Sequence, residues 1–226
     1  MAKAFSIVTQ FEGESRAINK ALIGIVKQHY IHVLRGLENI IRIKLQDLIA
    51  EAVENCELYD SLVNQNEEIY FELGAIRSPQ AMRDLVSILR ETVIVTKPTV
   101  RISNNTILVE MICSAVNTNW SKITNLPSAT YTSYGKNNTT TEINWLKWLL
   151  TSPPFIEGYQ VEFGSRMQGS RTGGALMRKI DGGSWELPIE FQGVPSDNFV
   201  TRAISKYNVN IKLEQYIYNT INRLIS

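Results

Sequence analysis

The feature that most constrains this chain is a long run of apolar residues at helical spacing near its N-terminus. From about residue 14 to residue 56, apolar side chains recur every three or four positions, and no proline interrupts them. That period is typical of an α-helix. One uninterrupted helix of about 40 residues would be about 60 Å long, which exceeds what the core of a compact domain needs. We therefore expect either a break near Gly36 or a helix that packs partly against something outside its own domain.

The apolar stripe on this stretch is wide. Additional isoleucines fall off its main face, namely Ile23, Ile25, Ile31 and Ile43. A helix that is apolar around much of its circumference needs partners on more than one side. Two interpretations stay open, which are burial within the monomer and packing against neighbouring subunits.

Two shorter helices are expected next. One covers residues 60–73 and ends at Gly74. The other begins with Ser78 as its cap and Pro79 in its first turn, and it continues to about residue 91. Serine before proline is a favourable helix start, because proline lacks the N–H that the first turn leaves unbonded.

After residue 91 the period changes to that of strands. Residues 92–96 are rich in β-branched side chains, and residues 100–103 and 106–115 flank an Asn-Asn turn, which predicts an antiparallel hairpin. The polar residues 125–141 are expected to form a long loop.

The last third alternates short apolar segments with polar, glycine-containing loops. Thr141 is the expected cap of a short helix that carries Trp145 and Trp148, whose spacing places them on one face, either in the core or at a subunit interface. Strands are expected at 159–163 and 175–180, a helix at 197–204 capped by Ser196, and a final helix within 208–225.

Together these elements predict an α+β protein. It would have a long N-terminal helical arm and a small, mostly antiparallel sheet with flanking helices. The change of period divides the chain into a helical region, 1–91, and an α+β domain with C-terminal helices, 92–226, unless the two form one continuous domain. A chain of 226 residues is long enough to bury a self-supporting core.

Composition narrows the function classes. The formal net charge is +1, whereas general nucleic-acid binders carry a strong basic excess. No apolar run is long enough to span a bilayer or to serve as a signal peptide. We therefore expect no membrane association, and we expect synthesis and assembly in a reducing cytoplasm. The only cysteines, Cys56 and Cys113, are expected to be buried reduced thiols, since two isolated cysteines are no disulfide framework.

The residues offer little for catalysis. His29 and His32 are the only histidines and have no carboxylate at ligand spacing, so no metal site is expected. The glycine-rich segment 169–174 lacks the lysine and the following helix of a phosphate-binding loop. No nucleophile–base arrangement is evident. We expect no enzyme activity and no cofactor.

A basic cluster is the main candidate for binding. Arg166, Arg171, Arg178 and Lys179 lie close in the sequence. Three interpretations stay open, namely pairing with acidic residues of a neighbouring subunit, a DNA-facing patch and ordinary solvated surface. The DNA-facing patch would make the chain a nucleic-acid-binding module.

One resemblance covers the last third well and the middle loosely. The loop Ser170-Arg171-Thr172-Gly173 is followed by an apolar strand, by Trp185 and Pro188, and by an Asp-Asn-Phe helix start that leads to Arg-Ala-Ile. This order resembles the neck and tail-completion proteins of tailed bacteriophages.

The resemblance implies a structural virion protein that acts in viral assembly as a head–tail connector. Its subunits would form a homo-oligomeric ring, a hexamer or dodecamer, at the neck. The ring would join a portal or adaptor protein to a tail terminator or tail tube protein, and genomic DNA would pass through the lumen without tight binding. The candidate contacts with neighbouring subunits or partners are Arg166, Arg171, Thr172, Gly173, Arg178, Trp185, Asp197 and Asn198.

Overall fold

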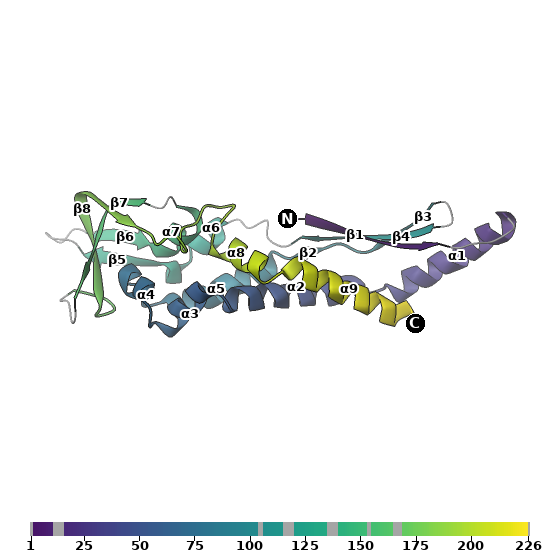
Figure 1. Cartoon of the computed structure of the whole chain (residues 1–226), viewed down its shortest axis with the longest axis horizontal. Coiled ribbons are helices and arrows are strands. Elements are labelled where there is room, and N and C mark those ends of the chain that lie inside the picture. Colours follow the sequence, from purple (N-terminus) through teal and green to yellow (C-terminus); the bar gives the residue numbers. More distant parts are fainter. Residues whose placement is uncertain are drawn as a thin grey trace. The chain divides into compact units, whose positions relative to one another are not determined.

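The structure, a computed structural model, describes residues 2–10, 16–103, 106–114, 120–134, 140–152, 155–164 and 169–225. The chain forms two compact units. Unit 1 comprises Met1–Ile49, Arg90–Asn117 and Asn208–Ser226, and unit 2 comprises Ala50–Leu89 and Thr118–Tyr207. Both units draw segments from either side of residue 91, so they are interleaved along the chain. Helices and antiparallel strands occur in both (Figure 1), which confirms the α+β class.

The N-terminal helical arm is confirmed, and it is divided. Helix α1 (Arg16–Val33) is followed by α2 (Leu37–Glu54). The break lies near Gly36, as expected. Gly36 has a φ of 84°, a left-handed value that residues with side chains rarely adopt, and this conformation interrupts the helix. The α2 residues that belong to unit 1 bury a stripe of Leu37, Ile41, Leu45, Leu48 and Ile49.

The final helix of unit 1, α9 (Val209–Ile225), begins after Asn208, which has a left-handed φ of 55°. It buries Val209, Leu213, Ile217 and Ile221, each one helical turn beyond the last. Ile211 and Tyr218 are two further large apolar residues of this helix, and their side chains are 52% and 68% exposed.

Unit 1 also contains an antiparallel sheet. Its strands are β1 (Ala2–Gln10), β2 (Ile94–Val95), β3 (Thr99–Ser103) and β4 (Thr106–Ser114), in the order β1-β4-β2 with β3 also pairing with β4. The expected hairpin is confirmed by the pair Ser103↔Thr106, and its turn, 104–105, lies outside the described residues. Strand β1 was not expected; it pairs along its whole length with β4, from Ala2↔Ser114 to Gln10↔Thr106 (Figure 1).

The two faces of this sheet differ. Val95, Val109, Met111 and Cys113 are buried, whereas Ile94 and Ile112 are exposed on the opposite face. Alternation of this kind is expected for antiparallel strands that cover a core with one face.

The helices of unit 2 correct one prediction. The helix expected at 60–73 is two helices, because Gln65 has a φ of 58° and ends the first. The expected end at Gly74 is confirmed. The helix expected from Ser78-Pro79 is also present, but Ser78 is its first residue and not its cap, and the Ser78 hydroxyl donates to the Leu62 carbonyl. The helices are α3 (Glu57–Asn64), α4 (Glu68–Leu73), α5 (Ser78–Glu91), α6 (Trp120–Thr124), the 3-10 turn η1 (Pro127–Ala129), α7 (Trp145–Thr151) and α8 (Phe199–Lys206).

The long loop expected at 125–141 is wrong for its described part. Strands β5 (Thr130–Tyr134) and β6 (Thr140–Asn144) form an antiparallel pair there. Tyr131 pairs with Ile143, and Ile143 is 1% exposed, so the pair is anchored in the core even though most of its residues are polar. Residues 135–139 lie outside the described residues.

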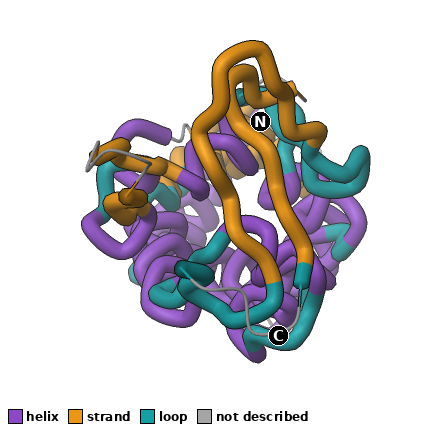
Figure 2. Tube along the Cα trace, turned by 90° about the vertical axis from the view of Figure 1, so that its left-hand side faces the viewer, coloured by secondary structure: helices purple, strands orange, loops and turns teal. Residues whose placement is uncertain are grey.

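The strands expected at 159–163 and 175–180 are confirmed and are longer than expected. β7 (Phe155–Phe163) and β8 (Ala175–Glu186) lie side by side as a long antiparallel pair (Figure 2). Their register shifts between Glu157 and Tyr159, where Gly158 has a φ of 78°. A bulge at such a point bends the pair.

Tryptophans form part of the core of unit 2. Trp145 is 1% exposed, and the Trp148 ring lies 5.1 Å from the Tyr159 ring and 5.8 Å from the Trp185 ring, between centroids. Aromatic rings at these separations stabilise a core beyond the area that they bury. The structure therefore places Trp145 and Trp148 in the core of the unit.

Both expected caps in the last third are wrong by a few residues. Helix α7 is capped by Asn144, not Thr141, and the Asn144 side chain accepts from the Lys147 N–H. Helix α8 begins at Phe199 and is capped by Asn198, not Ser196. The helix that was expected to start at Asp197 starts later because Asn198 and Thr201 form a reciprocal capping box.

Candidate functional site

The loop that carries the sequence resemblance is held by its own hydrogen bonds. The Ser170 hydroxyl donates to the Ala175 carbonyl and accepts from the Gly173 N–H at 2.8 Å. Gly173 has a φ of 87°, which favours glycine. The Thr172 hydroxyl donates to the Phe71 carbonyl at 3.3 Å, and this bond ties the loop to α4. These hydrogen bonds therefore give the loop a defined conformation within unit 2.

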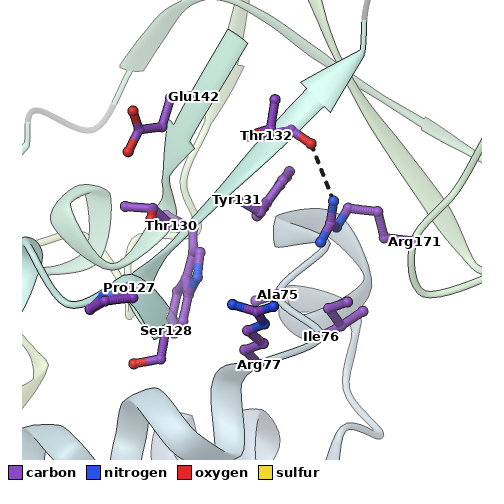
Figure 3. Close-up of a pocket in the computed structure, with 11 residues that line it drawn as sticks. Ala75, Ile76, Arg77, Pro127, Ser128, Thr130, Tyr131, Thr132, Glu142 and Arg171 are labelled. Atoms are coloured by element: carbon purple, nitrogen blue, oxygen red, sulfur yellow. Dashed lines mark hydrogen bonds between the residues drawn. The ribbon is translucent and has the colours of Figure 1, made fainter. Parts of the chain in front are cut away.

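Arg171 projects from this loop onto the β5 strand. Its guanidinium lies 4.3 Å from the centre of the Tyr131 ring, and its Nη1 donates to the Thr132 carbonyl at 3.2 Å (Figure 3). The Tyr131 hydroxyl in turn donates to the Leu73 carbonyl at 2.8 Å. Burial raises the pKa of the Tyr131 phenol, against the opposing effect of Arg171, so the phenol keeps its proton at neutral pH. Two contacts thus fix the direction of the Arg171 side chain.

A pocket of about 360 Å³ lies beside Arg171. Its lining comes from the segment before α5, from η1 with β5 and β6, from α7 and from the Arg171 loop; the residues are Ala75, Ile76, Arg77, Pro127, Ser128, Thr130, Tyr131, Thr132, Glu142, Trp145 and Arg171 (Figure 3). A second hollow of about 200 Å³ shares Tyr131, Thr132 and Arg171 with it. Arg171 therefore lines both hollows.

Arg77 is the second arginine of the pocket, and it is among the lining residues that the sequence analysis missed. It directly precedes α5, is exposed, and lines the same pocket as Arg171 (Figure 3). Nothing in its sequence neighbourhood marks it, because the residues that share its pocket come from segments far along the chain.

Only some of the basic side chains in the cluster 166–179 could bind a partner. Nε of Arg178 lies 3.3 Å from Oε2 of Glu162, so this arginine is ion-paired across the β7–β8 pair. Lys179 and Arg171 are exposed, and Arg166 lies outside the described residues. The described members therefore do not form one continuous set of free cations.

The remaining predicted contact residues take part in bonds within unit 2. Trp185 is 6% exposed and Asn198 is fully buried. Asn198 accepts from the Val200 and Thr201 N–H groups and donates to the Leu150 and Val194 carbonyls. Asp197 is ion-paired with Arg202 at 3.0 Å. A Cβ added at Gly193 would clash with the Leu149 carbonyl and with Asn198. The absence of a side chain at Gly193 therefore allows its backbone to pack closely against the Asn198 cap.

One carboxyl group of unit 2 is buried beside Trp185. Among the described residues, Oε2 of Glu72 has no hydrogen-bond partner. Burial is the main cause that raises the pKa of Glu72 to about 7; the charge of Glu68 raises it further, and the Trp185 indole N–H lowers it. Glu72 is therefore partly protonated at neutral pH.

Other titratable groups show no arrangement for metal or thiol chemistry in the part of the chain that the structure describes. His29 and His32 are exposed on α1, and no group of three metal-ligating side chains is found there. Both cysteines are free; burial raises the pKa of Cys113 to about 11 and also raises that of Cys56, so both stay thiols at neutral pH.

Comparison with known proteins identifies no relative of this chain. No protein-family model, curated protein or solved structure matches the chain. Among the described residues, no helix combines the length and the apolar character needed to cross a bilayer.

Proposed function

We propose that the chain is a structural subunit of a tailed-bacteriophage virion that forms a ring at the neck. The ring would join the head connector to the tail and surround the passage of the DNA. Two features support the proposal, namely the order of the loop, strand and capped helix in the last third, and the apolar surface of unit 1.

The apolar surface of unit 1 is the observation that carries the proposal. Ile25 on α1 is 67% exposed, Ile43 on α2 is 59% exposed and Ile94 on β2 is 58% exposed. Further large apolar side chains that are exposed on this unit are Ile31, Ile40, Ile112, Ile211, Tyr218 and Leu224. Exposed apolar side chains that gather in one region mark interaction sites, and four of these isoleucines lie on the consecutive helices α1 and α2. We take a second copy of the chain as the occupant, because the wide apolar stripe of α1 and α2 then has a partner on its second side.

The proposed partners follow from the same role. The ring itself would be a hexamer or dodecamer, closed by head-to-tail contacts between identical subunits. Portal or adaptor proteins would lie on one side and tail terminator or tail tube proteins on the other. A near-neutral chain suits a lumen that DNA slides through, since strong phosphate binding would hold the DNA in place.

Replacing Ile25 and Ile43 together with serine should prevent assembly. Each isoleucine loses about 2 kcal/mol of burial when its partner is water instead of protein, and a ring repeats that loss at every interface. Light scattering coupled to size-exclusion chromatography should show rings for the wild type and smaller species for the double variant. Ile189→Ser is the matched control, because Ile189 is 77% exposed on unit 2; it should assemble normally. A wild type that stays monomeric at every concentration contradicts the proposal.

The location at the neck needs a separate test. Antibody-gold labelling of intact phage particles that contain the protein should place the label at the head–tail junction. Label on the capsid surface or tail fibres, with rings still formed in solution, would keep the assembly role and overturn the location.

A further inference from the structure

We propose that the pocket between Arg77 and Arg171 binds the carboxylate of an acidic side chain in an extended segment of a partner protein. The inference stands on unit 2 alone and does not depend on ring formation, which rests on unit 1.

The first support is that Arg171 is held in place before any ligand arrives. Its guanidinium stacks on Tyr131 and its Nη1 bonds to the Thr132 carbonyl, while Tyr131 is itself anchored to Leu73. No other hydrogen bond of this side chain occurs in the described structure, so its remaining N–H groups are free to donate. An arginine that is already ordered loses little conformational entropy on binding, and its planar donors match a carboxylate.

The second support is the missing counter-charge. Arg90, Arg101, Arg178 and Arg202 each lie within 3.3 Å of a carboxylate oxygen. Within the described residues, neither Arg77 nor Arg171 has a carboxylate at ion-pair distance, and the Arg77 side chain makes no hydrogen bond. Two unpaired arginines that line one pocket produce a positive potential there, which attracts an anion.

The third support concerns the type of anion. Glu142 is exposed and lines the same pocket (Figure 3), and its charge disfavours a doubly charged phosphate more than a singly charged carboxylate. Glu142 also offers acceptor oxygens for backbone N–H groups, and Thr130 and Thr132 are further polar residues of the lining. A polypeptide segment with one acidic side chain supplies both the carboxylate and the N–H donors. The volume of about 360 Å³ accommodates a few residues of such a segment.

The test uses the full chain and a defined probe. The probe is the acetylated, amidated pentapeptide Gly-Ala-Glu-Ala-Gly, and its glutamine counterpart is the control peptide. Saturation-transfer NMR detects weak binding even when the protein is part of a large assembly. At low salt we expect the glutamate peptide to bind with a Kd of about 1 mM and the glutamine peptide to bind at least tenfold more weakly, because charge-assisted hydrogen bonds are the stronger ones.

Arg77→Gln is the decisive variant, because the exposed Arg77 side chain supports no described contact and its loss leaves folding intact. It should weaken binding of the glutamate peptide about tenfold, and Arg77→Lys should restore part of the loss. Arg101→Gln, in unit 1, should leave binding unchanged. Equal binding of the two peptides, full binding by Arg77→Gln, or tighter binding of inorganic phosphate than of the glutamate peptide would each overturn the inference.

Discussion

Asn198→Ala is expected to lower the free energy of unfolding of unit 2 by about 3 kcal/mol. The side chain caps α8 by accepting from the Val200 and Thr201 N–H groups, and loss of such a cap costs about 1 kcal/mol. Its amide also donates to the Leu150 and Val194 carbonyls at 3.2 Å. A buried carbonyl that loses its donor costs about 1 kcal/mol or more. Urea denaturation followed by far-UV circular dichroism measures the change.

Asn198→Ser separates the two contributions. Serine keeps the cap, since its hydroxyl accepts from the same N–H groups, but it cannot reach both carbonyls. We expect a loss of about 2 kcal/mol for this variant. Asn222→Ala, at an exposed position on α9, serves as the control and should be neutral. If Asn198→Ala proves as stable as the wild type, the capping box does not stabilise the unit.

Glu72→Gln is expected to raise stability at pH 8 by about 2 kcal/mol and to change it little at pH 4. The pKa of the Glu72 carboxyl is near its ordinary value of 4.5 in the unfolded chain, and burial raises it to about 7 in the folded protein. Between these values the folded state holds a proton that the unfolded state has released. The contribution of Glu72 to stability is therefore fully present below about pH 4.5 and is lost as the pH rises to about 7 and beyond.

The measurement is a series of urea denaturations between pH 4 and pH 8. The wild type should lose stability relative to Glu72→Gln across this range, because glutamine is neutral throughout. Glu186→Gln is the matched control, since Glu186 adjoins Trp185 in sequence but is exposed, and its curve should follow that of the wild type. Parallel curves for the wild type and Glu72→Gln would show that the buried carboxyl does not carry a raised pKa.

Local sequence signals were sufficient to predict the elements whose structure is determined by neighbouring residues. Gly36 divides the helical arm because its backbone is left-handed, and α5 begins at Ser78, one residue before the predicted first helical residue Pro79. The hairpin of β3 and β4 follows from two strand-forming segments joined by a two-residue turn. In each case the residues that set the structure are neighbours in the sequence.

The errors have a common physical cause, which is that distant residues decided the outcome. Strand β1 is stabilised by β4, from which the whole helical arm separates it in the sequence. The polar pair β5–β6 is anchored by the buried Ile143, although its composition is that of a loop. The cap of α8 was wrongly assigned to Ser196, because the side chain that decides the start is the Asn198 amide, which forms a reciprocal pair of bonds with Thr201.

The same distinction between local and distant residues applies to the candidate site. The sequence singled out Arg171, Thr172 and Gly173 as candidate contacts, and within unit 2 they contact Tyr131, the Phe71 carbonyl and the Ser170 hydroxyl, respectively. Arg77 could not be identified, since its place beside Arg171 depends on how α4, α5 and the β5–β6 pair fold together. Charge alone also could not show that Arg178 is ion-paired while Arg171 is not.

The interleaving of the units along the chain has a consequence for synthesis. Every residue of unit 2 precedes Asn208, so a ribosome releases all of unit 2 before α9 emerges. Until then the nascent chain lacks Val209, Leu213, Ile217 and Ile221, which belong to the core of unit 1. Apolar surface that is exposed during translation attracts chaperones and promotes aggregation, so the earlier segments of unit 1 are open to both until α9 has been made.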